Sequence, residues 1–110
     1  MHIDGYSFGE IVVDGTTYTS DLIIFPDCIV PDWRRRRGHL LQPADLADVI
    51  AARPGHLVVG TGAYGRMTVS DETRELLDRE NIPFEVLSTG EACRAFNRRG
   101  DAAAALHLTC

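Results

Sequence analysis

Short apolar runs alternate with helix-forming segments through most of this chain, and this alternation constrains the fold more than any other feature. The runs cover residues 22–25, 57–59 and 82–87. Continuous apolar runs of this length are typical of strands that are covered on both faces. Strands that alternate with helices form right-handed βαβ units, so the residues predict an α/β protein built on a largely parallel sheet.

Three helices are expected between and after these strands. Pro43 suits the first turn of a helix, because its missing N–H has no intrahelical partner there. Ser70 is predicted to cap a second helix. Ser88 and Glu91 have the spacing of a capping box for a third helix that runs to about residue 98. The apolar stripe of this third helix consists of Ala92, Cys93 and Phe96.

Both ends of the chain are expected to add strands. Asp14 and Gly15 lie between two β-forming segments, 11–13 and 16–18, and this dipeptide is typical of a type I′ hairpin turn. The tail at 102–108 is ambiguous. Its alanines favour a helix, but seven residues are too few for an isolated helix, and an edge strand fits as well.

Length, charge and cysteine usage exclude several classes of protein. A chain of 110 residues predicts one α/β domain spanning 1–110. The net charge of −5 argues against general nucleic-acid binding. No apolar run approaches the ~20 residues of a membrane helix, so we expect no membrane insertion. The first ten residues carry two acids and no base, which is unlike a signal peptide. Three cysteines without a CxxC pair favour a reducing, cytoplasmic location.

The charges are unevenly distributed, and the change of sign falls on one segment. Residues 1–32 contain six acids and no base, whereas all 11 basic residues, every one of them arginine, lie beyond. The absence of lysine excludes lysine-based catalysis. The segment begins with Trp33, Arg34 and Arg35 and continues through Arg36 and Arg37. A solvated run is the simplest interpretation. Because Trp and Arg are favoured interface anchors, Trp33, Arg34 and Arg35 are also candidates for binding a protein partner.

A glycine-rich turn follows the second apolar run. Residues 60–65 match G-x-G-x-x-G, but four further residues precede Ser70, which is not the spacing of a dinucleotide-binding fingerprint. The pattern instead predicts a tight turn that lets the backbone approach another group closely. Open α/β sheets bind ligands at this end of their strands. Gly60, Thr61 and Gly62 are therefore candidates for a small-molecule site, and an anion near Arg66 is an alternative.

Cys93 is a weak candidate for a catalytic nucleophile. It falls in the first two turns of the third helix, where the helix dipole lowers a thiol pKa. No histidine lies near it in the sequence to act as a base, and a small buried residue is the simpler interpretation. No histidine pairs with another histidine or a cysteine at ligand-like spacing, so we expect no metal and no cofactor.

The order of these motifs resembles a small family of unknown function. The matching segments are 25–39, 60–62, 82–89 and 91–97, and their order and spacing extend the resemblance over nearly the whole chain. The family includes a mitochondrial assembly factor of respiratory complex I (the third-numbered one) and the adipogenesis-associated domain protein. The segment after Asn97 is shorter here than is usual in the family, which puts any role of that loop in doubt.

This resemblance implies a three-layer fold with a central mixed five-stranded sheet, helices and an additional N-terminal β-hairpin layer. It also implies that the tail is a strand antiparallel to the others. The family brings no established reaction, and its best-understood members act in protein assembly. Its matching positions would place Trp33, Thr61, Thr89, Cys93 and Asn97 around the glycine turn.

Two functions follow as expectations. The first is a non-enzymatic module that binds or assembles with an unidentified protein through Trp33, Arg34 and Arg35. The alternative is a small-molecule or anion-binding protein, with enzymatic activity as a further option. Its site would lie at Gly60, Thr61 and Gly62, with Trp33, Thr89 and Asn97 as additional ligand-binding residues. Exposed strand edges also allow a homodimer.

Overall fold

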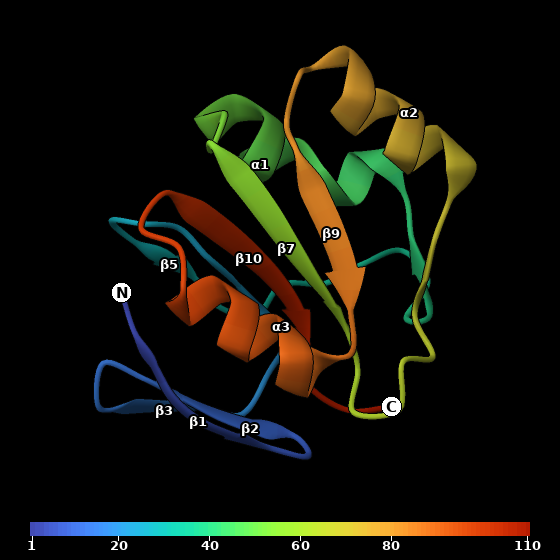
Figure 1. Ribbon diagram of the computed structural model, residues 1–110. Coiled ribbons are helices and arrows are strands. Elements are labelled where there is room, and N and C mark those ends of the chain that lie inside the picture. Colours follow the sequence, from blue (N-terminus) through green and yellow to red (C-terminus); the bar gives the residue numbers. More distant parts are fainter.

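A five-stranded mixed sheet forms the centre of the computed structural model, which describes residues 1–110 (Figure 1). The strand order is β5-β4-β10-β7-β9. β10 runs parallel to β7, and β7 runs parallel to β9, whereas β4 is antiparallel to both β10 and β5. This arrangement confirms the mixed sheet that the family resemblance implies. The strands are β4 (Leu22–Ile24), β5 (Ile29–Val30), β7 (His56–Thr61), β9 (Phe84–Leu87) and β10 (Ala102–His107).

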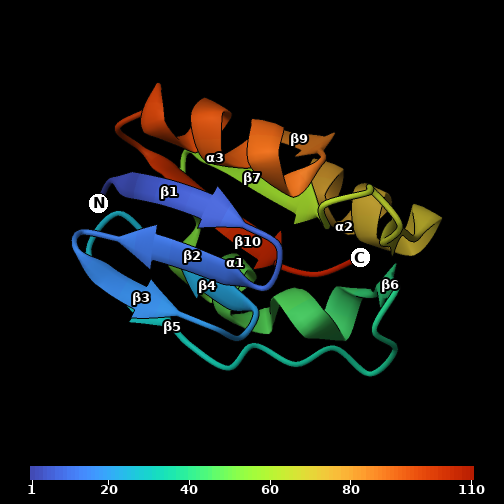
Figure 2. The same ribbon diagram turned by 90° about the horizontal axis from the view of Figure 1, so that it is seen from below.

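Each face of this sheet is covered by a further layer (Figures 1 and 2). On one face lie the helix α3 (Thr89–Asn97) and an antiparallel sheet of β1 (Ile3–Ser7), β2 (Glu10–Val13) and β3 (Thr16–Tyr18). On the other face lie the 3-10 helix η1 (Pro43–Leu46), α1 (Ala47–Ala52), α2 (Asp71–Arg79) and the short parallel pair β6 (Leu40–Leu41) and β8 (Thr68–Val69). The fold therefore has the expected three layers.

Alternation along β10 supplies both hydrophobic cores. Ala104 and Leu106 pack into the core beneath α3 and the N-terminal sheet, whereas Ala103 and Ala105 pack into the core beneath α1 and α2. All four side chains are fully buried. The strand forms although alanine favours helix, because pairing with β4 on one side and β7 on the other outweighs local propensity.

The placement of β10 corrects two expectations. The resemblance implied a tail antiparallel to the other strands, but β10 is antiparallel only to β4 and is parallel to β7. The residue pattern suggested an edge strand, but β10 occupies the middle of the sheet. The two edge positions belong instead to β5 and β9, and the four residues of β9 are only half-buried because no strand pairs with its outer side. The expectation that residues 82–87 form a fully buried strand is therefore wrong.

The N-terminal layer contains the predicted hairpin and one additional strand. β2 and β3 pair around Asp14 and Gly15, whose φ angles of 48° and 81° fit a type I′ turn. β1 was not predicted, because its sequence contains Asp4 and Gly5 and shows little apolar alternation. It pairs with β2 and completes a three-stranded sheet.

All three helices start where the sequence predicts, but the capping hydrogen bonds of the third differ from the prediction. Ser70 caps α2 by accepting a hydrogen bond from the Thr73 amide at 3.2 Å. The segment that begins at Pro43 is helical, although its first turn is a 3-10 helix. Ser88 precedes α3, but its hydroxyl donates to Glu91 Oε1 at 2.9 Å and accepts no helical amide, so the predicted capping box is not formed. None of the helices is long and apolar enough to cross a bilayer.

The C-terminal segment closes against the turn that follows β7. Gly62 has a φ of +106°, a region that residues with a side chain rarely adopt. A Cβ added there would lie 2.8 Å from the Thr109 carbonyl oxygen and 2.9 Å from that of Cys110. Two backbone segments thus approach each other at a distance that only glycine permits.

We expect Gly62→Ala to destabilise the protein by about 1–3 kcal/mol, because the alanine is strained at positive φ and collides with backbone. Urea unfolding at neutral pH measures this difference. Gly90→Ala is the matched control. Gly90 is helical and has open space around its Cβ position, so this change should be neutral or stabilise α3. Equal stabilities of the two variants would contradict the close approach at Gly62.

Candidate functional site

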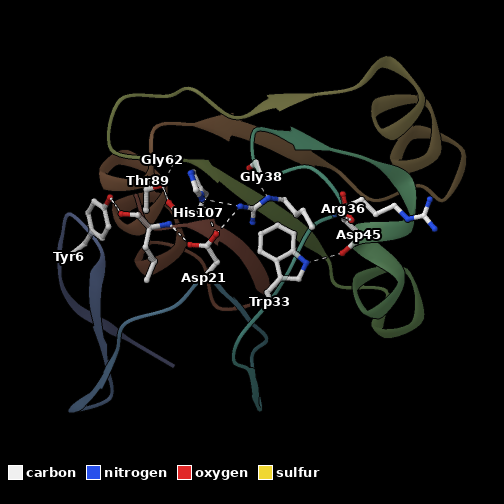
Figure 3. Close-up of polar contacts among 11 residues, drawn as sticks. Tyr6, Asp21, Trp33, Arg36, Gly38, Asp45, Gly62, Thr89 and His107 are labelled. Atoms are coloured by element: carbon white, nitrogen blue, oxygen red, sulfur yellow. Dashed lines mark hydrogen bonds and ion pairs between the residues drawn. The ribbon is translucent and has the colours of Figure 1, made fainter. Parts of the chain in front are cut away.

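Three largely buried polar side chains, those of Asp21, Arg35 and His107, meet beside the carboxyl end of β10. Figure 3 shows Asp21 and His107 directed toward one another. Arg35 Nη2 donates to Asp21 Oδ2 at 2.8 Å, and His107 Nδ1 lies 2.8 Å from the same oxygen. Because an ionised carboxylate only accepts hydrogen bonds, His107 Nδ1 carries the proton that it shares with Asp21. The approach of Arg35 Nη2 to His107 Nδ1 at 3.0 Å is then a close contact between two donors. We refer to Asp21, Arg35 and His107 as the buried polar cluster.

The register of the sheet brings this cluster together. Leu22 of β4 pairs with Leu106 of β10, so Asp21 and His107 are neighbours just beyond that pair. The second carboxylate oxygen of Asp21 accepts from the Leu108 amide at 2.7 Å. Burial by itself raises the pKa of the Asp21 carboxyl, but hydrogen bonds from His107, Leu108 and Arg35 together lower it below its ordinary value. Asp21 is therefore the anionic centre that holds the cluster together.

Arg35 is unusually buried for an arginine, with only 4% of its side chain exposed. Its guanidinium lies over the Trp33 indole, with Cζ 4.7 Å from the ring centroid, and its Nε donates to the Gly38 carbonyl at 3.1 Å. Its Nη1 has no hydrogen-bond partner in the protein, and neither does His107 Nε2. Buried polar atoms nearly always have partners, so these two nitrogens are exceptions within an otherwise satisfied cluster.

The segment that carries Arg35 alternates between buried and exposed residues. Trp33 is 8% exposed, and its Nε1 donates to the Asp45 carbonyl at 3.0 Å. Arg34, Arg36 and Arg37 are exposed, and none of their side chains has an ion-pair or hydrogen-bond partner. Figure 3 shows Arg36 directed away from His107 and Asp21. The two inward side chains thus hold a backbone that presents three arginines to solvent.

A cleft of about 310 Å³ opens beside the buried polar cluster. Two of its lining residues, Asp21 and Arg35, belong to the cluster, and the Trp33 indole is the only hydrophobic lining. The cleft is lined by Ser20, Asp21, Asp32, Trp33, Arg34, Arg35 and Gly38. The three residues predicted as a partner interface, Trp33, Arg34 and Arg35, therefore share one concave surface.

The glycine turn lies behind the cluster and lines none of the clefts in the structure. The Gly62 amide donates to Thr89 Oγ1 at 2.8 Å, and the Thr89 hydroxyl in turn donates to the His107 carbonyl (Figure 3). The Thr61 hydroxyl donates to the Leu87 carbonyl at 2.9 Å. A Cβ on Gly60 would lie 2.8 Å from the Leu106 side chain. The close approach that the sequence predicts here is an approach to the protein's own strands and tail.

Asn97 and Cys93 lie on α3, away from the cleft. The Asn97 amide group accepts from the Ile3 amide at 2.9 Å and donates to the Ile3 carbonyl at 2.8 Å, which ties β1 to α3. Cys93 is buried, and burial raises the pKa of its thiol to about 11. Among the predicted ligand-binding residues, the structure therefore places Trp33 at the cleft, Gly60, Thr61, Gly62 and Thr89 behind it, and Asn97 elsewhere.

Sequence reasoning missed Asp21 and His107. It considered Asp32 only as an ion-pair partner of the arginines, and the Asp32 side chain forms no ion pair. Asp21 and His107 are separated by nearly the whole chain, and no motif links an isolated aspartate to a histidine in an alanine-rich tail. The only available signal was the acidic N-terminal region followed by four consecutive arginines, which indicates that some arginines have aspartate partners. No group of three or more histidine, cysteine, aspartate or glutamate residues in the structure could hold a metal ion.

Removal of the Asp21 charge is expected to destabilise the fold strongly. Asp21→Asn leaves the buried Arg35 without its counter-ion, which costs about 3–5 kcal/mol at pH 7. The pKa of Asp21 is lower in the folded state than in the unfolded state. The contribution of Asp21 to the free energy of unfolding is therefore fully present above the unfolded pKa of about 3.9, and it is lost as the pH falls through the folded-state pKa. Denaturant unfolding should show that the difference in free energy of unfolding between wild type and Asp21→Asn becomes smaller below about pH 4. Asp78→Asn, at an exposed position of α2, should change stability by less than about 0.5 kcal/mol.

Cys93 is expected to react slowly with iodoacetamide in the folded protein, because little of its thiol is ionised near neutral pH. Cys28 is exposed and serves as the internal reference. Peptide mass spectrometry after timed labelling should show Cys28 modified before Cys93, with Cys93 modified only on unfolding. Faster labelling of Cys93 than of a free cysteine would restore it as a candidate nucleophile.

Known structures share this fold over nearly the entire chain. A conserved hypothetical protein, PH1505 from Pyrococcus horikoshii OT3, is 26% identical, covers 100% of both chains and superposes with a TM-score of 0.84. A protein from Bartonella henselae described as an outer membrane protein is 26% identical, with a TM-score of 0.80 and coverage of 98% of this chain and 94% of that one. A Mth938-like domain from Bordetella pertussis shares the fold at 16% identity, with a TM-score of 0.66 and coverage of 97% and 85%.

A family model matches almost the full length of the sequence. It is described as a protein of unknown function (DUF498/DUF598), and it matches residues 3–107. The match includes every element of the central sheet and the whole buried polar cluster. The chain therefore belongs to the DUF498/DUF598 family of proteins of unknown function.

Proposed function

We propose that this protein is a non-enzymatic binding or assembly module that recognises an acidic surface of a protein partner. The observation that carries the proposal is the exposed trio of Arg34, Arg36 and Arg37 on a backbone fixed from within. We refer to these three residues as the arginine face. All three guanidinium groups are free of internal ion pairs, so they retain their full capacity to bind carboxylates.

The arginine face is held in place before any partner arrives. Trp33 and Arg35 anchor alternate positions of the segment, and the Arg36 amide donates to Asp45 Oδ1 at 3.3 Å. The Trp33 amide also donates to the Asp21 carbonyl at 2.8 Å. Because binding a preorganised segment loses less conformational entropy, such a surface gains affinity over a flexible basic loop.

The structure changes the roles assigned within the segment. Trp33, Arg34 and Arg35 were predicted as the anchors of an interface, but Trp33 and Arg35 are largely buried. In this proposal Arg34 binds the partner together with Arg36 and Arg37, and Trp33 and Arg35 position them. The resemblance to a family with a complex I assembly factor and the adipogenesis-associated domain protein supports an assembly role.

Reversal of two charges on the arginine face should weaken partner binding at least about tenfold, because like charges then face the acidic partner. The variant is Arg36→Glu with Arg37→Glu, since neither residue lines the cleft or contacts the buried polar cluster. Tagged protein captures partners from an extract of the source organism after mild crosslinking, and the recovered partner is then titrated with purified protein at low and high salt. Binding by wild type should fall as the salt concentration rises.

The control carries the same change in net charge at exposed arginines elsewhere, Arg66→Glu with Arg94→Glu. This control should retain the partner. A partner that binds the Arg36 and Arg37 variant as tightly as wild type, or that is lost equally from the control, would exclude the arginine face as the interface.

A further inference from the structure

The cleft beside the buried polar cluster contains one free carboxylate and one free guanidinium. Asp32 and Arg34 both line it, both are exposed, and neither side chain has an ion-pair or hydrogen-bond partner. They are two residues apart in the chain, yet no contact within 4.0 Å joins their charged groups. Each is thus available to a group of opposite charge that enters the cleft.

The remaining charges of the cleft are already matched. Asp21 accepts from Arg35 and His107 through one oxygen and from the Leu108 amide through the other, so its capacity as an acceptor is largely used. Arg35 Nη1 has no protein partner, but the atom is buried and the whole side chain is only 4% exposed. Arg35 therefore adds positive charge beneath the cleft, and this charge favours an anionic group over a cationic one.

These groups discriminate between classes of ligand. A simple anion would gain from Arg34 and Arg35 but would be repelled by Asp32. A simple cation would gain from Asp32 but would be repelled by both arginines. A ligand with an ammonium group and a carboxylate a few ångströms apart can pair its carboxylate with the arginines and its ammonium with Asp32 at the same time.

We propose that the cleft binds a small zwitterion of the free α-amino acid class. The ligand carboxylate accepts from Arg34 and approaches Arg35, and the ligand ammonium donates to Asp32. This site shares Arg34 with the arginine face but does not include Arg36 or Arg37, which do not line the cleft. Because the ligand is tested at Asp32 and the protein partner at Arg36 and Arg37, the two proposals can fail independently.

The size and polarity of the cleft agree with this class. Its volume of about 310 Å³ lies at the lower end of the range for ligand sites, about 300–1,000 Å³, which suits a single amino acid better than a nucleotide. Trp33 is its one hydrophobic lining residue, so a lipid or a large aromatic ligand would find little apolar surface to cover.

Trp33 also provides the assay, because it is the only tryptophan in the chain. The purified protein is titrated with each of the standard L-amino acids at constant ionic strength, and indole emission is recorded. Melting temperature is measured in parallel at about 10 mM ligand. This concentration is ten times a Kd of about 1 mM, so even binding as weak as that would raise the melting temperature. At least one amino acid should give a saturable change in emission and raise the melting temperature.

The amino acid that binds is then compared with its N-acetyl derivative, which lacks the ammonium charge, and with its amide, which lacks the carboxylate. Each derivative should bind about tenfold or more weakly, because a charge-assisted hydrogen bond is lost. Equal binding of the N-acetyl derivative would overturn the assignment of a zwitterion in favour of an anion. Absence of any response from all the amino acids would overturn the proposal itself.

Asp32→Asn tests the site without disturbing the fold or the arginine face. Asp32 has a φ of +53°, a conformation that asparagine adopts readily, so this variant should remain folded. It should bind the amino acid about tenfold or more weakly while retaining the protein partner. Arg36→Gln, beside the cleft but outside it, should bind the amino acid as wild type does. Unchanged affinity in Asp32→Asn would overturn the role of this carboxylate and with it the proposed site.

Discussion

A buried arginine requires a counter-ion, and the organisation of this protein around Asp21 follows from that requirement. Desolvating a guanidinium costs several kcal/mol unless an anion and further hydrogen bonds compensate for it. Asp21 supplies the anion at 2.8 Å, and its second oxygen binds the Leu108 amide. One carboxylate thus joins the start of β4, the basic segment and the end of β10.

This interaction explains why four consecutive arginines have different environments and different roles. Arg35 is used to hold the segment in place, and its stacking on Trp33 fixes the indole as part of the wall of the cleft. Arg34, Arg36 and Arg37 remain solvated and unpaired. The result is a local concentration of positive charge on a backbone held from within, on a protein of net charge −5 and next to a cleft of mixed charge. This arrangement supports both proposals, binding of an acidic protein surface by the arginine face and binding of a zwitterionic ligand in the cleft.

The glycine turn has a structural role that complements the cluster. Gly62 and Thr89 lie against the carbonyl groups of the C-terminal segment, directly behind His107. These contacts hold the end of β10 where His107 and Leu108 can reach Asp21. The turn therefore supports the cleft from behind, and Cys93, with its raised pKa, lies in the separate core beneath α3.

Local sequence determined many of the elements of this fold, whereas tertiary structure decided how they pair and which side chains meet. The type I′ turn at Asp14 and Gly15, the Ser70 cap and the apolar strand β7 were predictable, because short-range sterics and hydrogen bonds set them. The family resemblance also predicted the three layers and the mixed sheet. The sequence alone could not place β10 in the middle of the sheet, since alanine favours helix locally and only pairing on both sides reverses that preference. Nor could it separate Arg35 from its neighbours. Burial of one arginine among four depends on an aspartate 14 residues earlier and a histidine 72 residues later, which only the register of β4 on β10 brings together.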